Sequence, residues 1–348
     1  VCRPVVCSRT FGLKDDRIMF ERRIQFVVSL VVLLFSYQAT AAAFDKIKIF
    51  YSSVGGANSS LWIAKDAGFL AKEGIEAELI FISGSTVAAS TLISGQAKIG
   101  FIGGSAPVLA RLHGSDLLTV ANTTTKALFS LMTTPDIQSL DDLRGKTLGV
   151  VRYGSTSDIA IRTVLKRSGI DPQKNVKIVQ AGGLAEIVAA MQGKKISGGI
   201  VTPPVTFEAK KLGFRELLNP DGVGIKFSQT GVVISERYLK SDRALFQAFV
   251  RAFVRGIHFY KTQKNTSLSI LKKYARMTDF DILQETYRLY ALEFLAKAPY
   301  PTEESIQTIL DLIKENEPKA QAAKPSEFIY PDFVQELDSS GFIDALYK

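Results

Sequence analysis

IFISGSTVAASTLISGQAKIGFIGGSAPVLA, residues 80–110, contains the same structural pattern twice. An apolar strand runs into the small residues at 83–86, and a second apolar strand runs into those at 103–105, with a helix predicted after each loop. Pro107 suits the first turn of the second helix, where no N–H is needed. Both loops would place free N–H groups and hydroxyls at one sheet edge, which suits a polar or anionic small molecule. They are equally compatible with ordinary turns between a strand and a helix.

The rest of the chain extends this alternation. Strands are predicted at 46–51, 76–82, 99–102, 117–121, 147–151, 176–180, 198–201 and 231–235. Helices are predicted at 61–71, 158–167, 184–192, 207–212, 243–263, 282–294 and 303–314. Strands that alternate with helices indicate an α/β protein, with helices on both faces of mostly parallel sheets. Loops at the carboxyl ends of such strands are where these sheets bind ligands.

The first 43 residues are predicted to lie outside the folded part of the protein. Residues 19–43, MFERRIQFVVSLVVLLFSYQATAAA, combine a cationic pair, a short apolar run and small residues, which is typical of a secretory signal peptide cleaved before Phe44. Residues 1–18 resemble no targeting element and are interpreted as an extension translated from too early a start. A periplasmic location is therefore expected.

Composition and charge exclude several classes of function. With 46% hydrophobic and 22% charged residues, the chain of 348 residues has a normal globular composition. Its net charge of +9 is dispersed and lacks the basic and aromatic run of a nucleic-acid surface. The only cysteines are Cys2 and Cys7, and His113 and His258 lie far apart, so no metal site is expected.

Four segments carry a resemblance to a known family. They are 54–75 (VGGANSSLWIAKDAGFLAKEGI), 83–110, 139–158 (SLDDLRGKTLGVVRYGSTSD) and 181–204 (AGGLAEIVAAMQGKKISGGIVTPP). The chain resembles the periplasmic substrate-binding proteins of ABC importers, in the branch of aliphatic-sulfonate, taurine and nitrate binders and of proteins related to thiamine-pyrimidine biosynthesis. The resemblance covers residues 46–348.

The resemblance implies a two-lobed periplasmic-binding-protein fold of type II, with a hinge between the lobes. Residues 46–132 and 232–348 would form lobe one, and residues 133–231 would form lobe two. It further implies a monomer without a cofactor, which takes a small-molecule ligand and delivers it to an inner-membrane permease.

Ligand-binding loops are implied in both lobes. From lobe one they are Gly56, Ala57, Asn58, Ser83, Gly84, Ser85, Gly104, Ser105, Thr123 and Thr124. From lobe two they are Arg152, Tyr153, Gly154, Ser155, Thr156, Ser157, Gly182, Gly183 and Thr202.

The charged candidates have alternative interpretations. Arg152 could bind an anionic headgroup, or it could be a surface arginine at the end of a strand. Glu186 could reach a ligand amine, although the first turn of a helix favours a carboxylate in any case. Thr202-Pro203-Pro204 replaces the Asp-Pro of many relatives, so an acidic contact to a ligand amine is missing there. The loops favour a small organic anion or a neutral polar heterocycle.

Three functional hypotheses follow. The first is a transport receptor without catalytic activity. The second is an enzyme of the thiamine-pyrimidine type, but residues 44–348 contain no cysteine for the iron motif that this activity needs. The third is a ligand-sensing partner of a membrane signalling protein, which would have the same sequence features. A serine hydrolase is disfavoured because the segment 103–107, GGSAP, ends in proline where a nucleophile elbow needs glycine.

Overall fold

The computed structural model describes Val1 and residues 44–124, 126–224, 227 and 229–348. The predicted signal peptide at 19–43 lies outside the described residues, as does the predicted extension at 1–18 apart from Val1. None of the helices in the described part of the chain is both long and apolar enough to cross a membrane.

The first of two five-stranded sheets belongs to lobe one. Its strand order is β2 (Ile75–Phe81), β1 (Phe44–Tyr51), β3 (Ile99–Gly103), β10 (Thr230–Ser235) and β4 (Leu117–Asn122). β1 pairs in parallel with both of its neighbours, and β10 runs antiparallel to β3 and β4. Four strands therefore share one direction, as the alternation of strands and helices predicts.

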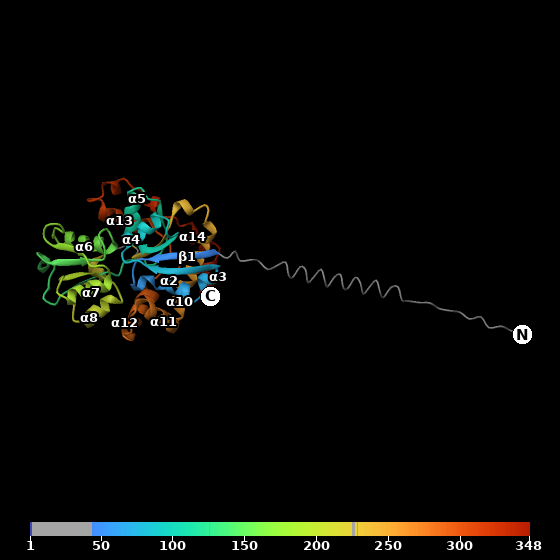
Figure 1. The fold of residues 1–348 in the computed structure, drawn as a ribbon, viewed down its shortest axis with the longest axis horizontal. Coiled ribbons are helices and arrows are strands. Elements are labelled where there is room, and N and C mark those ends of the chain that lie inside the picture. Colours follow the sequence, from blue (N-terminus) through green and yellow to red (C-terminus); the bar gives the residue numbers. More distant parts are fainter. Residues whose placement is uncertain (2–43, 125, 225–226, 228) are drawn as a thin grey trace. The chain divides into compact units, whose positions relative to one another are not determined.

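The second sheet repeats this arrangement in lobe two (Figure 1). Its order is β7 (Lys177–Gln180), β6 (Thr147–Val150), β8 (Gly198–Val201), β5 (Ser130–Thr133) and β9 (Arg215–Leu218). β6 is parallel to β7 and β8, whereas β5 is antiparallel to β8 and β9. In each sheet the antiparallel strand is the first one after the chain crosses from the other sheet.

Strand pairing corrects the predicted lobe boundaries. β5 pairs throughout with β8 and β9, so the chain has crossed to lobe two before Ser130 and not after residue 132. β10 begins at Thr230 in the sheet of lobe one, two residues before the predicted return. The crossing segments are therefore 123–129, between β4 and β5, and 224–229, between α9 and β10, of which residues 125, 225, 226 and 228 lie outside the described residues. The sequence hides the first crossing because no local pattern shows that β5 pairs with β8 and β9.

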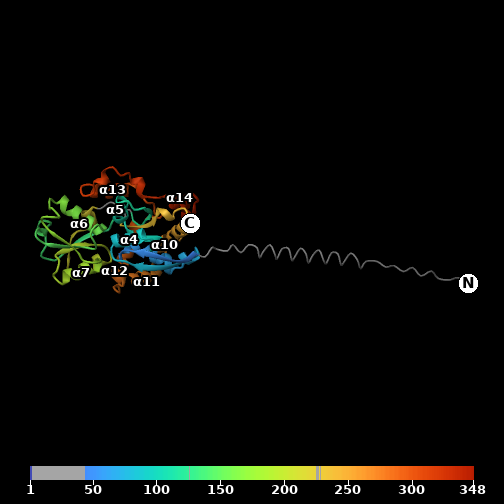
Figure 2. The same cartoon turned by 45° about the horizontal axis from the view of Figure 1, so that its top comes forward.

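Helices cover both faces of each sheet (Figures 1 and 2). Lobe one carries α2 (Ser59–Asp66), α3 (Phe69–Lys72), α4 (Ser85–Ile93), α5 (Ser105–Leu112), α10 (Arg243–Thr262), α11 (Lys264–Ala275), α12 (Phe280–Tyr287), α14 (Asp332–Ser339) and α15 (Phe342–Leu346). Lobe two carries α6 (Thr156–Arg167), α7 (Leu184–Gln192), α8 (Val205–Lys211) and α9 (Pro220–Val223). Short 3₁₀ turns lie at Gly56–Asn58, Asp141–Leu143, Glu236–Tyr238, Pro318–Gln321 and Pro325–Phe328.

Two helices predicted as continuous are interrupted. The helix at 61–71 divides into α2 and α3 because Gly68 adopts φ +77°, which a right-handed helix cannot contain. The helix at 282–294 changes after α12 into a π-helix, Arg288–Phe294. This wider turn buries the ring of Tyr290 beside the Gly56–Asn58 segment.

The long helix α10 and the helix α13 (Glu303–Ile313) have different packing roles. α10 buries the predicted apolar face, including Phe246, Phe249 and Phe253, in the core of lobe one. Ile306, Ile309 and Leu310 of α13 instead pack in one cluster with residues of α5 and α6. α13 therefore connects the two lobes on the side visible in Figure 2.

Candidate functional site

The loops at the carboxyl ends of the strands meet in a pocket of about 50 Å³ between the two sheets. A single water needs about 10–15 Å³ by this measure, so the pocket holds a few water-sized groups and a larger ligand requires the lobes to separate. Its lining consists of Ser52, Ser53, Gly84, Ser85, Gly103, Phe129, Val151, Ser155, Thr156, Ser157, Leu184, Thr202, Gln229 and Thr230. Six of the residues implied by the resemblance are among them: Gly84, Ser85, Ser155, Thr156, Ser157 and Thr202.

Three helices begin at this pocket with residues that line it: α4 at Ser85, α6 at Thr156 and α7 at Leu184. None of the three has a side chain that caps its N-terminus. The first N–H groups of a helix have no partner within the helix, and the helix dipole is positive at that end. The pocket thus offers hydrogen-bond donors from the backbone, although the carboxylates of Asp158 and Glu186 lie in the first turns of α6 and α7 and offset part of the positive helix dipole there.

Buried hydroxyls add to these donors. Ser85 Oγ and Thr202 Oγ1 are buried, and neither forms a hydrogen bond of normal geometry with the described residues. A buried hydroxyl without a partner costs free energy, and a ligand atom in the pocket could satisfy it. The hydroxyls of Ser155 and Ser157 are instead used locally, because Ser155 Oγ donates to the carbonyl of Arg152 at 2.6 Å and Ser157 Oγ accepts from the N–H of Val151 at 3.0 Å.

Glycines allow the two lobes to approach closely around the pocket. A Cβ on Gly103 of β3 would lie 2.4 Å from Thr156 Oγ1 of α6, and one on Gly84 would lie 2.4 Å from Arg152 Cγ. The N–H of Gly56 donates to the carbonyl of Pro203 in the other lobe at 2.9 Å. Side chains larger than hydrogen at Gly103 and Gly84 would meet residues of the other lobe and hold the lobes apart.

Two predicted serines make contacts between the lobes. Ser83 Oγ donates to the carbonyl of Gly182. Ser105 Oγ donates to the carbonyl of Gly154 at 3.3 Å and lies at the same distance from Thr156 Oγ1. Neither Ser83 nor Ser105 lines the pocket, although Thr156, which Ser105 contacts, does.

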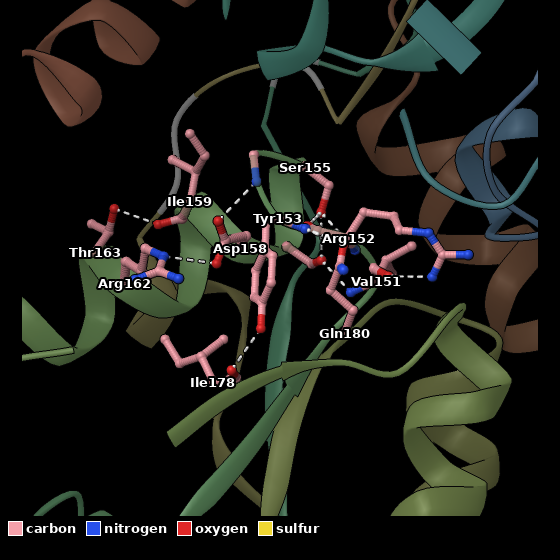
Figure 3. A network of polar contacts seen from close by, with 12 residues as sticks. Val151, Arg152, Tyr153, Ser155, Asp158, Ile159, Arg162, Thr163, Ile178 and Gln180 are labelled. Carbon is pink, nitrogen blue, oxygen red and sulfur yellow. Dashed lines mark hydrogen bonds and ion pairs between the residues drawn. The ribbon is translucent and has the colours of Figure 1, made fainter. Parts of the chain in front are cut away.

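The loop of Arg152 and Tyr153 is held by its own lobe (Figure 3). Tyr153 is 49% exposed, and its hydroxyl donates to the carbonyl of Ile178 at 3.0 Å, so its ring lies outside the pocket lining. The N–H of Gly154 donates to Asp158 Oδ2 at 2.9 Å, and Arg162 Nε donates to Asp158 Oδ1 at 2.7 Å.

Neither charged candidate lines the pocket. Arg152 packs over Gly84, and its Nη1 donates to the carbonyl of Val151 at 3.0 Å. The carboxylate of Glu186 lies beside Gly183, where a Cβ would be 2.3 Å from Oε2. It therefore sits at the start of its own helix, α7, as the helix dipole favours.

The remaining predicted residues lie next to the pocket rather than in its lining. Gly56, Ala57 and Asn58 are buried in a 3₁₀ turn behind it, and Gly104 precedes α5. Thr123 and Thr124 lie on the first crossing segment, where Thr123 Oγ1 donates to the carbonyl of Thr230 at 2.8 Å.

The lining also contains residues that sequence reasoning missed. Ser52 and Ser53 belong to the Gly/Ser/Asn-rich segment 52–60, so composition could have identified them. Phe129 and Gln229 lie on the two crossing segments. No local motif marks these two, because their position follows from the pairing of distant strands.

Comparison with known proteins finds related sequences. The family model described as NMT1/THI5 like matches residues 58–265. The formylaminopyrimidine-binding protein of Halalkalibacterium halodurans is 21% identical over 232 residues, which cover 65% of this chain and 69% of that protein.

Solved structures share the fold at low sequence identity. The periplasmic aliphatic sulphonate binding protein SsuA from Escherichia coli superposes with a TM-score of 0.66 at 18% identity, covering 82% of this chain and 92% of that one. The periplasmic nitrate-binding protein NrtA from Synechocystis PCC 6803 gives a TM-score of 0.70 at 14% identity, covering 85% of this chain and 88% of that one. The two-lobed α/β fold expected from the sequence is thereby confirmed.

Proposed function

The chain belongs to the NMT1/THI5-like family, and from that premise we propose that it is the solute-binding receptor of an ABC importer. It would capture a small solute in the pocket between the lobes and present the closed form to a membrane permease. The importer role is supported by the fold, which this chain shares with periplasmic binding proteins for sulphonate and nitrate.

The observation that carries the proposal is the donor-rich pocket. Three uncapped helix N-termini and the unpartnered hydroxyl of Ser85 offer hydrogen-bond donors to an acceptor atom of a ligand. The described lining contains no carboxylate that would repel an anion. We infer that the ligand is a small organic anion or a polar heterocycle whose oxygen or ring nitrogen atoms accept hydrogen bonds.

The names of the relatives support this ligand class. The related proteins are named for aliphatic sulphonate, nitrate and formylaminopyrimidine, all of which carry acceptor atoms. The small pocket favours a compact ligand such as nitrate or a short sulfonate unless the lobes open further. The segment Thr202-Pro203-Pro204 provides no carboxylate, which disfavours ligands that depend on an amine.

Binding is favoured over catalysis because the described lining contains no histidine, cysteine, lysine, arginine or acidic side chain. The lining does contain serine and threonine hydroxyls, but such a hydroxyl needs an adjacent general base to act as a nucleophile, and no side chain of the described lining is one. A receptor role also implies an extracytoplasmic location, which the predicted signal peptide at 19–43 and the periplasmic relatives support.

A thermal-shift screen against short alkanesulfonates, nitrate, carboxylates and pyrimidines tests this proposal. A compound present at 100 times its Kd should stabilise the protein by about 2.7 kcal/mol, which corresponds to a shift of several degrees in a protein of this size. We expect a saturable shift with acceptor-bearing compounds of one class and no chemical turnover of the bound compound. Turnover would favour the enzyme hypothesis, and no shift across the panel would contradict the proposed ligand class.

A further inference from the structure

Gln229 lies where the pocket meets the second crossing segment. It is only 5% exposed, yet it belongs to the pocket lining together with Ser85 and Thr202. A buried carboxamide in a ligand pocket has one face that accepts hydrogen bonds and one that donates them. The direction in which the carboxamide points therefore decides which ligand atoms it can recognise.

The hydrogen bonds of Gln229 fix that direction. Its Oε1 accepts from the backbone N–H of Leu128 at 3.2 Å and from the hydroxyl of Tyr290 at 3.1 Å. A backbone N–H can only donate, so the oxygen, not the nitrogen, must occupy this position. The NH₂ group consequently points the other way, beside Gly55 and Thr202: a Cβ on Gly55 would lie 3.6 Å from Gln229 Nε2 and 2.8 Å from Thr202 Oγ1.

The partners of the amide oxygen are themselves held in place. Tyr290 is fully buried, and a Cβ on Gly56 would lie 2.3 Å from its ring carbons, so the ring fills the space that this glycine leaves. Burial raises the pKa of Tyr290, which keeps its hydroxyl protonated and able to donate at neutral pH. The backbone N–H of Gln229 also donates to Thr124 Oγ1 at 3.4 Å.

We propose that Gln229 is a specificity-determining residue that donates its side-chain NH₂ to an acceptor atom of the ligand. Gln229 lies on the second crossing segment and is hydrogen-bonded to Leu128 and Thr124 on the first. A ligand held by this amide is therefore linked through Gln229 to both crossing segments. This inference rests on the proposed function, since it assumes that solutes enter this pocket.

Gln229→Glu tests the inference with little change in shape. One carboxylate oxygen can still accept from Leu128 and Tyr290, while the other replaces the donor that faces the pocket with a negatively charged acceptor. Binding of methanesulfonate and nitrate, measured by titration calorimetry, is expected to weaken at least about tenfold, the size of one lost hydrogen bond to a charged group. Methylammonium, which carries only donors, should gain in affinity.

Further variants separate recognition from folding. Gln229→Met removes the NH₂ donor without adding a charge and should also weaken anion binding. It leaves the Leu128 N–H and the Tyr290 hydroxyl without their acceptor, so its free energy of unfolding is measured beside its affinity. Tyr290→Phe removes one of the two donors that orient the amide and should weaken binding less than Gln229→Glu. Gln335→Glu makes the same charge change on an exposed residue of α14 and should bind both anions as the wild type does.

The outcomes distinguish the inference from the proposed function. If the wild type binds methanesulfonate or nitrate and both Gln229 variants bind it equally well, the inference is overturned and the receptor function stands. If the wild type binds neither anion nor any pyrimidine of the panel, the proposed ligand class fails, and the inference fails with it.

Discussion

Ser85 is buried at the start of α4, and its hydroxyl has no hydrogen-bond partner among the described residues. On folding, this hydroxyl loses its hydrogen bonds to water and gains none from the residues that the structure describes, which costs free energy. The residue is explained if its partner is a ligand atom. At the residue scale, the donor-rich pocket is thus a local cost in stability that ligand binding offsets.

Ser85→Ala should therefore separate binding from stability. We expect Kd for the bound anion to rise about tenfold, while the free energy of unfolding without ligand stays unchanged or increases by up to about 1 kcal/mol. Ser90→Ala is the matched control in the same helix, because its exposed hydroxyl bonds only to the carbonyl of Thr86 at 3.1 Å. Calorimetric titration and chemical denaturation measure the two effects. Equal affinities of Ser85→Ala and the wild type would argue against a ligand contact at this hydroxyl.

At the scale of elements, Asp116 connects the start of β4 to the end of β10. Its carboxylate accepts from Arg237 Nε at 2.7 Å, from Arg237 Nη2 at 2.8 Å and from Ser235 Oγ at 2.6 Å. The hydrogen bonds from Arg237 hold the pKa of Asp116 well below its usual value of 3.8. The unfolded state therefore binds the proton more readily, and this contribution to stability is present above about pH 3.8 and is lost as the pH falls below it.

Asp116→Asn should lower the free energy of unfolding at pH 7 by about 1 kcal/mol or less, because the pair is partly exposed. The difference from the wild type should shrink as the pH falls from 4 towards 2, since the wild-type carboxylate is then progressively protonated. Denaturation curves measured across this pH range test the prediction. The exposed Asp344→Asn serves as control, and a difference that is independent of pH would contradict the role given to Arg237.

Most elements could be predicted from the sequence, but two strands of lobe two, β5 and β9, could not. Strands such as β3 and β6 have apolar runs that end in small residues, and α10 has a clear apolar face. Short length does not explain why β5 and β9 could not be predicted, because β6 also has four residues, but β9, Arg215–Leu218, begins with two charged residues. Their structure depends on pairing with each other and with β8, which no local pattern reveals.

The pocket residues that could be predicted are those whose position follows from a local pattern of strand and loop. Ser85, Thr156 and Thr202 follow strands in small-residue loops, so their place at the sheet edge follows from topology. Arg152 and Tyr153 belong to such a loop, but their side chains bond within lobe two. Gln229 reaches the pocket only because two distant crossing segments lie side by side.

At the scale of the whole molecule, glycines of lobe one lie at close points between the lobes, with Gly103 against Thr156 and Gly84 against Arg152. Gly103→Ala should push the lobes apart, because its Cβ would lie 2.4 Å from Thr156 Oγ1 across the interface. We expect anion affinity to fall more than about tenfold, since the donors of α4 and α6 no longer converge. Small-angle scattering should show a larger radius of gyration.

Gly100→Ala, in the same strand, provides the control for this prediction. Its Cβ would meet Leu92 Cδ1 at 2.6 Å within lobe one, so it should lower stability without separating the lobes. Wild-type affinity in Gly103→Ala would show that the closeness of the lobes at this point is not needed for binding.

The central claim is that a ligand binds between α4 and α6, and a crystal structure of the protein with methanesulfonate or nitrate tests it most directly. The account predicts an anion between the two lobes, with an oxygen at about 3 Å, hydrogen-bond distance, from Ser85 Oγ and from the first N–H groups of α6. An anion bound only on the outer surface, or a pocket occupied by water alone at saturating anion, would contradict it.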